Sequence, residues 1–430
     1  MNTLSLLQES LSNALAAFGG VFWFFSFFWF LILPPLFYFI FKLLWYPHVW
    51  NKYASGLQFV LLELIPPREI EASPLPMESV FAGIAGAKQS ATTVEHVIKG
   101  HYQATFSLEV ASLEGQVHFY IRTQKSFRNL VEAQFYAQYP TMEIVEVEDY
   151  MDRIPRTAPN KDWNVWGTDF EFVKPDAYPI RTYKYFEESV TGKMVDPLSA
   201  LIETMSKAGP GQYMLLQYII APEEESWYKT GMQAVDELLG REKPHSPGIL
   251  EHLLDGFVNL LFFIINLGQS SEEAKKEEKK NEQPLEFKLT LGQREILKAI
   301  EANMSKIMFR AKMRYVYVGR NEGFAKSTGV SSIIGAIKQF NDQSLNSVKL
   351  YNPTKTEAHY VLVGPRLRYM QRRILNRFRL RSTYPAENVL HFSIEELATI
   401  FHIPDMAIVA PSLSRVAAKR GGAPSNLPIE

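Results

Sequence analysis

An uncharged stretch near the N-terminus constrains this chain most. No charged residue occurs between Glu9 and Lys42, and residues 20–41 are apolar almost throughout, GVFWFFSFFWFLILPPLFYFIF. At about 1.5 Å per residue, roughly 22 helical residues span a hydrocarbon layer of about 30 Å. A core helix of a soluble protein is seldom apolar on every side over such a length. The stretch therefore predicts a single transmembrane helix over residues 20–45, after a short extracytoplasmic segment, 1–19.

A secretory signal peptide is the other interpretation of this stretch, and three features argue against it. The apolar region is too long, no basic region precedes it, and no small-residue cleavage site follows it. Lysine and arginine are absent before the stretch, whereas Lys42, Lys52 and Arg68 follow it closely. The positive-inside rule therefore predicts one pass through the inner (cytoplasmic) membrane, with the N-terminus outside and the bulk of the chain in the cytoplasm. We expect four aromatic residues at that lipid interface: Trp45, Tyr46, Trp50 and Tyr53.

The composition predicts a folded protein and excludes some kinds of site. Apolar residues make up 47% of the 430 residues and charged residues 21%, which is enough apolar material for a substantial core. The chain has no cysteine, so it forms neither disulfides nor thiolate metal sites. Because the formal net charge is only −1, any surface for DNA or anionic lipid must be local.

The pattern of apolar residues predicts an α+β fold over residues 57–150. An apolar run, FVLLELI, ends at two prolines, and a helical pattern begins at Ser73. A hairpin pattern occupies TFSLEVASLEGQVHFYIRT, a second helical pattern ends before Pro140, and a strand pattern closes the region. The order β-α-β-β-α-β is that of a ferredoxin-like unit.

A second α+β region is predicted over residues 160–350. Its strand and helix QYMLLQYIIAP and GMQAVDELLG are similar to LQFVLLELIPP and MESVFAGIAG of the first region, which suggests a structural repeat. The uncharged part of the apolar segment 249–267 is too short to span a membrane. That segment is either a helix that contacts lipid or a partner, or a core helix. The charged segment 269–284 predicts a solvated linker.

The sequence contains no recognisable motif for catalysis or for a cofactor. The closest approach to a phosphate-binding loop, GRNEGFAKS, has Phe324 where the second glycine belongs. The nine histidines form no HExxH pattern, and His118 and His402 are predicted to be hydrogen-bonded structural residues. We therefore expect a protein that is not an enzyme and that uses neither a cofactor nor a metal.

A basic segment, PRLRYMQRRILNRFRLR, lies in the C-terminal region 358–430. It contains no acid, and at helical spacing its arginines spread around much of the helix. Such a helix either binds DNA phosphates, anionic lipid headgroups or an acidic protein surface, or is a solvated helix paired with acids elsewhere in the fold. The candidate residues for contact with an anionic partner are Arg366, Arg368, Arg372, Arg373, Arg377, Arg379 and Arg381.

Three stretches carry a resemblance to a known family: FVLLELIPP, SLEVASLEGQVHFYIRTQKSFRNLVEAQFYAQYPTMEIVEVEDY and VLHFSIEELATIFHIPD. From residue 57 onward, the chain resembles an uncharacterised bacterial membrane-anchored domain. That domain precedes, or is encoded beside, TraG/HerA-like coupling ATPases of type IV secretion and conjugation systems. The tail APSNLP, residues 423–428, is similar to the junction at which fused forms enter their motor domain, but the Walker A motif of those forms is absent here.

The resemblance implies a supporting role beside a motor that another polypeptide supplies. We expect a membrane-anchored, non-catalytic scaffold for a translocation ATPase of the type IV secretion or conjugation kind, with residues 393–404 and the arginine segment as contact surfaces. A membrane-tethered nucleic-acid-binding protein that uses residues 366–381 is the alternative. Membrane lipid and a motor ATPase are the expected partners, and DNA and a second copy of the chain are further candidates.

Overall fold

The computed structural model describes most of the chain. The described residues are 33–67, 73–89, 92–186, 195–223, 226–239, 289–360, 362–383 and 387–404. Outside them lie the predicted segments 1–19, 249–267, 269–284 and 423–428, and residues 20–32 of the predicted transmembrane helix. The chain divides into two compact units, a larger one over residues 59–88 and 104–430 and a smaller one over residues 1–58 and 89–103.

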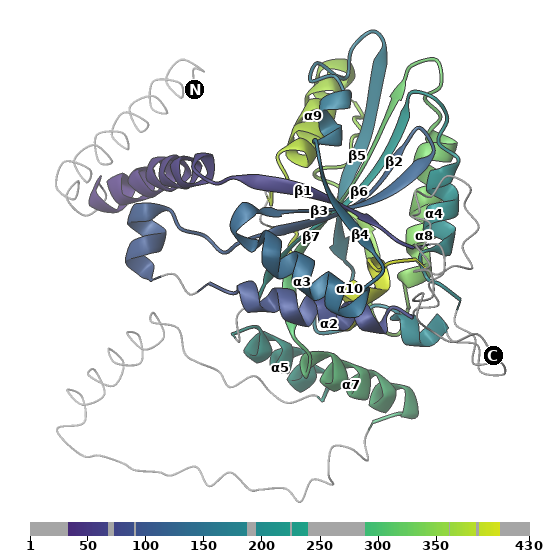
Figure 1. Ribbon diagram of the computed structural model, residues 1–430. Helices are drawn as coiled ribbons and strands as arrows, with labels where there is room; N and C mark the ends of the chain where they lie inside the picture. The colour runs from purple at the N-terminus through teal and green to yellow at the C-terminus, as the bar shows by residue number, and fades with distance from the viewer. Residues whose placement is uncertain are drawn as a thin grey trace, which may run out of the picture. The chain divides into compact units, whose positions relative to one another are not determined.

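An antiparallel sheet of nine described strands forms the centre of the larger unit (Figure 1). Its first half contains, in chain order, β1 (Phe59–Ile65), α2 (Leu75–Ile84), β2 (Phe106–Leu113), β3 (Gln116–Gln124), α3 (Arg128–Gln138) and β4 (Glu143–Val147). The strands pair antiparallel in the order β4-β1-β3-β2. The element order is the one that the sequence predicts for residues 57–150, and the predicted α+β class is confirmed.

The second half of the sheet repeats this element order with its strands in mirrored positions. It contains β5 (Trp163–Phe172), α4 (Ser199–Ser206), β6 (Gln212–Pro222), β7 (Met308–Arg320), α8 (Ser332–Ile337) and β8 (Val348–Leu350). Its strand order is β6-β7-β5-β8, and β6 pairs antiparallel with β2 along residues 106–113. The predicted regions 57–150 and 160–350 thus share one sheet.

The structural repeat has a different alignment from the one that the sequence predicts. The predicted repeat pairs β1 and α2 with β6 and α5 (Ser226–Leu238). By order and position, β1 and α2 correspond instead to β5 and α4. The predicted alignment is wrong because β1 and β6 are both largely buried, apolar strands with proline at or just after their ends, and burial selects the same residue types in both.

Helices pack on both faces of the sheet, and successive strand residues alternate between the two faces. One face packs against α2, α3, α4, α8 and α10 (Ile394–Ile400) in a core that includes Leu216 and Tyr315. The neighbouring residues Leu215 and Val316 point to the opposite face, where α9 (Val363–Arg379) packs. A short strand, β9 (Leu390–Ser393), pairs with the start of β7.

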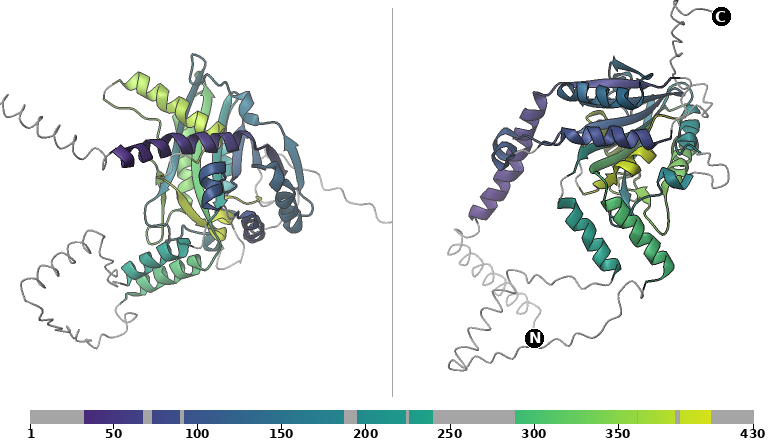
Figure 2. Two further views of the ribbon diagram at one scale, coloured as in Figure 1. Left: turned by 90° about the vertical axis from the view of Figure 1, so that its left-hand side faces the viewer. Right: turned by 60° about the horizontal axis from the view of Figure 1, so that its bottom comes forward.

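The chain between β6 and β7 contributes a pair of helices, α5 and α7 (Leu291–Met304), which lie side by side (Figure 2). Trp227 and Met304 belong to a small apolar core between them. A capping box starts α7: Gln293 N donates to Thr290 Oγ1 at 3.3 Å, and Thr290 N donates to Gln293 Oε1 at 2.9 Å. These two bonds satisfy backbone donors that a helix start leaves unpaired.

The smaller unit contains a helix over residues 33–55 and a short helical segment over 93–99, which includes η2 (Glu95–Lys99). The helix includes the last part of the predicted transmembrane span, and most apolar side chains from Leu36 to Leu44 are exposed. Within the described part of the chain, no helix combines the length and the apolar character that a membrane crossing requires.

Candidate functional site

Helix α9 contains most of the predicted contact arginines and packs against the sheet through one apolar side. Ile374, Leu375 and Phe378 are buried in the core that Leu215 and Val318 line from the strands. The spacing of the three helix residues, i, i+1 and i+4, places them on one side of a helix. The arginines consequently divide between the exposed side of α9 and its buried end.

Two contacts fix α9 on β5. Gly167 allows a close approach, because a Cβ there would lie 3.1 Å from both Cγ1 and Cγ2 of Ile374 and 3.1 Å from the carbonyl oxygen of Tyr315. Gln371 Nε2 donates a hydrogen bond to the Val165 carbonyl oxygen at 2.6 Å. Packing and hydrogen bonding together therefore set the orientation in which α9 presents its outer side.

Four arginines lie exposed on α9: Arg366, Arg368, Arg372 and Arg373. Tyr369 lies among them with 63% of its surface exposed, and the Arg373 guanidinium is 5.8 Å from the centre of its ring. Because no acid occurs between Arg366 and Arg381, no carboxylate on α9 offsets this charge. We call these four arginines and Tyr369 the arginine face.

The last arginines of the basic segment turn into the protein. Arg377 is buried near the end of α9, and Arg379 Nη2 donates to the Ile154 carbonyl oxygen at 3.1 Å. Arg381, two residues past the helix, is buried and has a positive φ of 50°. For Arg377 and Arg381, burial contradicts the predicted contact with an outside partner.

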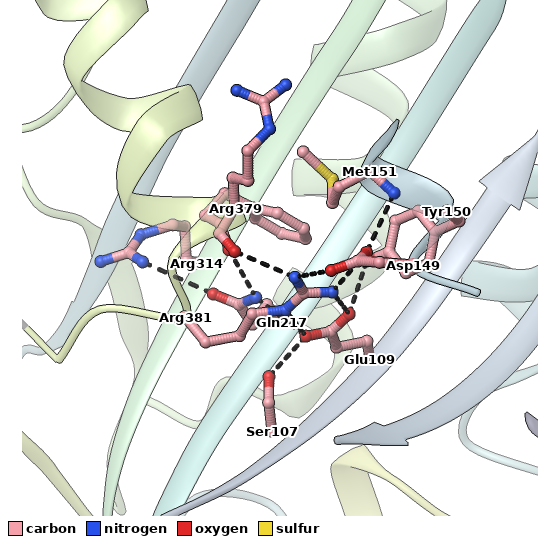
Figure 3. Close-up of polar contacts among 10 residues, drawn as sticks. Ser107, Glu109, Asp149, Tyr150, Met151, Gln217, Arg314, Arg379 and Arg381 are labelled. Carbon is pink, nitrogen blue, oxygen red and sulfur yellow. Dashed lines mark hydrogen bonds and ion pairs between the residues drawn. The ribbon is translucent and has the colours of Figure 1, made fainter. Parts of the chain in front are cut away.

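Arg381 binds two carboxylates that belong to different elements (Figure 3). Its Nε and Nη2 donate to the two oxygens of Glu109 on β2, at 2.9 and 3.2 Å, and its Nη1 and Nη2 donate to Asp149. Asp149 caps η4 (Tyr150–Arg153) by accepting from the Met151 amide at 3.0 Å. Arg381 thereby connects the end of α9 to the first half of the sheet and to the segment between the two halves.

Glu109 is fully buried, and hydrogen bonds engage both of its oxygens. Oε1 accepts from Ser107 Oγ at 2.6 Å and from Gln217 Nε2 at 3.0 Å, and Oε2 accepts from Tyr150 OH at 2.6 Å. Burial alone would raise the pKa of Glu109, but the Arg381 guanidinium and these donors hold it below its usual range. Burial likewise disfavours the charged form of Arg381, yet the carboxylates raise its pKa. The pair is therefore ionised, and structural donors occupy the carboxylate.

The network continues across the sheet toward β5. In the strand register, Glu109 lies opposite Gln217, Gln217 opposite Arg314, and Arg314 opposite Asp169. Arg314 Nε donates to Asp169 Oδ1 at 2.6 Å, and all four side chains are fully buried. We call these four residues the polar row. Because a slip of one residue would turn these groups onto the other, apolar face, the polar row specifies the register in which the two halves join.

A pocket of about 440 Å³ opens beside α5, and no sequence pattern predicts it. Trp227 of α5 lines it together with Asp176, Glu223 and His391. His391 Nε2 lies 3.2 Å from Glu223 Oε2, and Nδ1 contacts Asp176 Oδ2. Burial disfavours the charged imidazole, but the two carboxylates raise the pKa of His391 to about 9. At neutral pH the imidazole is protonated and bridges two carboxylates, so it is not poised as a general base.

The histidines that the sequence analysis singles out have partners inside the fold. His118 Nδ1 lies 2.6 Å from Glu63 Oε1, and the fully buried His402 has Nε2 3.1 Å from Asp196 Oδ1. The prediction of structural, hydrogen-bonded histidines is confirmed for both. Among the residues that the structure describes, no group of histidine and acidic side chains is arranged to hold a metal ion.

Residues 393–404, a predicted contact surface, lie in the core instead. Ser393 and Glu396 form a capping box at the start of α10, and this helix is buried from Glu395 onward. The Ile180 amide donates to Glu396 Oε1 at 2.9 Å and so joins the chain after β5 to α10. The predicted partner contact is wrong for this segment because its apolar residues pack against the sheet.

The four predicted interface aromatics lie along one stretch of helix and contact other parts of the smaller unit. Trp45 Nε1 donates to the Val97 carbonyl oxygen at 2.7 Å. Tyr46 stacks on Trp50 with ring centres 5.6 Å apart, and Tyr53 lies against a histidine ring with 5.2 Å between the centres. Each of these residues therefore has a partner within the protein.

A comparison with protein families gives one match, described as a domain of unknown function (DUF8128), over residues 83–415, well over half of the chain. A search of curated proteins returns no match. The matched region extends from the end of α2 through α10, so it contains the polar row, the arginine face and the pocket beside α5.

Proposed function

We propose that this chain, which belongs to the DUF8128 family, is a membrane-tethered, non-catalytic scaffold that holds a translocation ATPase through the arginine face. The family is one of unknown function. The proposal therefore rests on the surfaces of the molecule and on the resemblance to domains that accompany TraG/HerA-like coupling ATPases of type IV secretion and conjugation systems. The exposure of four arginines on α9 is the observation that carries it.

The arginine face is suited to an acidic protein surface. A guanidinium group binds a carboxylate through two parallel hydrogen bonds, which gives both strength and direction. Because Ile374 and Phe378 anchor α9 in the core, the backbone of this face is ordered before a partner arrives. Less conformational entropy is then lost on binding than a mobile basic segment would lose.

The sheet supports the role of a platform. Each half has the element order and strand order of a ferredoxin-like unit, and we infer that the larger unit is a tandem of two such units, joined through β2 and β6. The polar row favours one register at that joint. A joint of fixed register keeps α9 in one position, because Gln371 of α9 contacts the second half and Arg381, just past the helix, contacts the first.

Exposed apolar side chains support the membrane tether. Between Leu36 and Leu44 the helix exposes most of its large apolar groups, with Phe39 75% exposed and Leu43 71% exposed. Monomeric soluble proteins seldom expose contiguous apolar surface of this extent. The sequence continues this apolar run toward the N-terminus. We propose a single pass through the inner membrane, with the larger unit in the cytoplasm.

Affinity capture of the full chain from native membranes in mild detergent tests the scaffold. We expect a P-loop ATPase to be recovered with the wild-type chain and lost with the double variant Arg368→Glu and Arg372→Glu. The double variant Lys298→Glu and Lys338→Glu, which makes the same change in charge at two exposed lysines on other elements, is the matched control and should retain the ATPase. Recovery of no ATPase with the wild-type chain, or equal recovery with the double variant, would contradict the proposal.

A nucleic-acid-binding function is the second candidate, and Tyr369 favours it. An exposed aromatic ring between guanidinium groups can stack on an unpaired base while the arginines bind phosphates. Such binding releases counterions and weakens steeply with salt. Fluorescence anisotropy with labelled single-stranded DNA, measured over a salt series, should show salt-dependent binding that Tyr369→Ala weakens. A wild-type chain that leaves DNA unbound at low salt would eliminate this candidate.

A further inference from the structure

The short helical segment 93–99 lies against the helix 33–55 at a defined place. The Trp45 indole donates to the Val97 carbonyl oxygen at 2.7 Å, and His96 lies 5.6 Å from the ring centre of Trp50. The contacts along the helix therefore begin directly after the apolar residues that end at Leu44.

Gly100 lets the two segments approach closely. A Cβ at Gly100 would lie 2.5 Å from the Val49 carbonyl oxygen, and its φ of +70° favours glycine. This backbone contact fixes the end of the short segment beside the middle of the aromatic stretch. The segment 93–99 is thus positioned by hydrogen bonding, ring packing and backbone contact.

The outer side of this segment is apolar. Val94 and Ile98 are each 61% exposed, and their spacing of four residues places them on the same side of a helical segment. Short exposed helices normally direct polar residues outward, so two neighbouring aliphatic side chains here require an explanation.

The depth at which these side chains lie follows from the helix beside them. The exposed apolar residues Leu36 to Leu44 extend over about 12 Å at helical rise, roughly one leaflet of hydrocarbon. If this stretch lies in hydrocarbon, with the Lys42 amine extended toward the interface, then Trp45 to Trp50 lie at the level of the lipid headgroups. The segment 93–99 packs beside those residues and therefore lies at the same level.

Charge favours an anionic bilayer as the occupant of this surface. The described residues of the smaller unit contain three lysines, Lys42, Lys52 and Lys99, and one acid, Glu95. Lys99 Nζ and Glu95 Oε1 are 3.5 Å apart, so this acid is partly neutralised within its own segment. Basic residues near anionic headgroups each contribute about 1 kcal/mol to membrane binding.

We propose that the segment 93–99 is a second membrane-contact element, which lies in the headgroup layer and inserts Val94 and Ile98 into the bilayer surface. It holds the end of the anchor helix at a fixed angle to the bilayer, since both segments are joined through Trp45 and Gly100. The proposal rests on the membrane tether of the proposed function. Under this proposal Trp45 joins the two segments instead of contacting lipid, because its indole N–H group donates a hydrogen bond to the Val97 carbonyl oxygen.

Site-specific fluorescence quenching tests this element in the full chain. Since the chain has no cysteine, one introduced cysteine can be labelled without altering any other residue. Four single variants are needed: Val94→Cys, Ile98→Cys, Phe39→Cys in the anchor, and Lys207→Cys, at the exposed residue directly after α4, as the background control. Each carries a nitrobenzoxadiazole label in vesicles of phosphatidylcholine with a minor fraction of phosphatidylglycerol, with a nitroxide near the glycerol end of some acyl chains.

We expect quenching at positions 94 and 98 to exceed quenching at position 207 by about twofold or more, as for interfacial helices. Strong quenching at 39 with background quenching at 94 and 98 would overturn the second element and leave the tether intact. Background quenching at all four positions would overturn the tether and this inference together. A disulfide between two copies of the Val94→Cys variant, with background quenching there, would identify a second chain as the occupant and also overturn the proposal.

Discussion

Arg372 and Arg381 belong to the same basic segment, and the fold uses them in opposite ways. Arg372 lies exposed on the outer side of α9, whereas Arg381 is buried and bonded to Glu109 and Asp149. The difference does not come from residue type or from local charge. It comes from position: Arg372 lies on the outer side of α9, whereas Arg381 lies just past the end of the helix, where the chain turns toward the sheet. A run of like charges can therefore contain both a surface and part of the core.

Arg381 also has a backbone conformation that ordinary side chains avoid. A non-glycine residue in the left-handed region costs on the order of 1 kcal/mol. The bonds to two carboxylates offset that cost, and they place a positive charge beside the buried carboxylate of Glu109. The buried end of the segment is thus stabilised by ion pairs with two carboxylates, while Arg368, Arg372 and Arg373 lie exposed on α9.

The largest effect is expected from Arg381→Met. This change leaves the Glu109 carboxylate buried without its cation, and breaking a buried ion pair in this way costs about 3–5 kcal/mol. Urea unfolding of the full chain in detergent, followed by tryptophan fluorescence, measures the loss. The double variant Glu109→Gln and Arg381→Met should recover part of it, since no bare charge remains. Glu109→Gln is measured as the second single variant. If the double variant lost as much stability as Arg381→Met and Glu109→Gln together, the two residues would not be coupled.

A second prediction compares two buried glutamates. The pKa of Glu109 is lowered, but burial raises the pKa of Glu396 from 4.5 to about 7, against hydrogen bonds that lower it. Between pH 4.5 and about pH 7, the folded state keeps a proton on Glu396 that the unfolded state releases. Glu396 therefore favours folding less as the pH rises. The accumulated difference is on the order of 3 kcal/mol, since each pKa unit corresponds to more than 1 kcal/mol.

Glu396→Gln should remove this contribution and retain the capping box, which accepts glutamine. The stability of the variant relative to the wild type should therefore increase from pH 4.5 to about pH 7 and then level off. Unfolding midpoints at several pH values measure it. A difference that stays constant with pH would show that Glu396 titrates normally in the folded protein.

The third prediction concerns the contact that fixes α9 on the sheet. Gly167→Val places methyl groups where Ile374 already packs, and overpacking of this kind costs about 1–3 kcal/mol. Gly364→Ala, on α9 itself, is the control, because a Cβ there meets nothing within 4 Å. Unfolding midpoints should separate the two variants. Equal midpoints would mean that α9 does not depend on close approach to β5.

The elements of the first half of the sheet could be predicted because their periodicity and turn residues are local. The strands around Glu114-Gly115 and the helix before Pro140 follow directly from sequence patterns. The pairing of β2 with β6 could not be predicted, because a fully buried strand gives no signal for its neighbour on the far side. The predicted repeat failed for a related reason: β1 and β6 share burial, apolar residues and a nearby proline, but they do not occupy equivalent positions in the two halves.

The candidate site was predictable in part. Charge spacing identified the arginine segment, but it could not separate Arg372 from Arg381, because the partners of Arg381 are 272 and 232 residues away in sequence. One local signal existed: Glu109 interrupts a strand whose other residues are small or apolar, which indicates a buried acid that needs a cation. Residues 393–404 were predicted to be a contact surface from the family resemblance alone, and a resemblance in sequence does not distinguish a buried segment from an exposed one.

The smallest effect on stability is expected at the exposed end of the segment. Arg372→Ala removes a side chain that lies in water, and such changes usually alter the free energy of unfolding by less than about 0.5 kcal/mol. The same variant should weaken capture of the proposed partner ATPase, or binding of DNA under the alternative function, because the arginine face loses one of its four charges. Unfolding and binding measured on the same preparations therefore sharpen the comparison. Arg381→Met should change mainly the free energy of unfolding, and Arg372→Ala should change only binding. If Arg372→Ala destabilised the fold as much as Arg381→Met, the two ends of the segment would share one structural role and the arginine face would lose its claim to a partner.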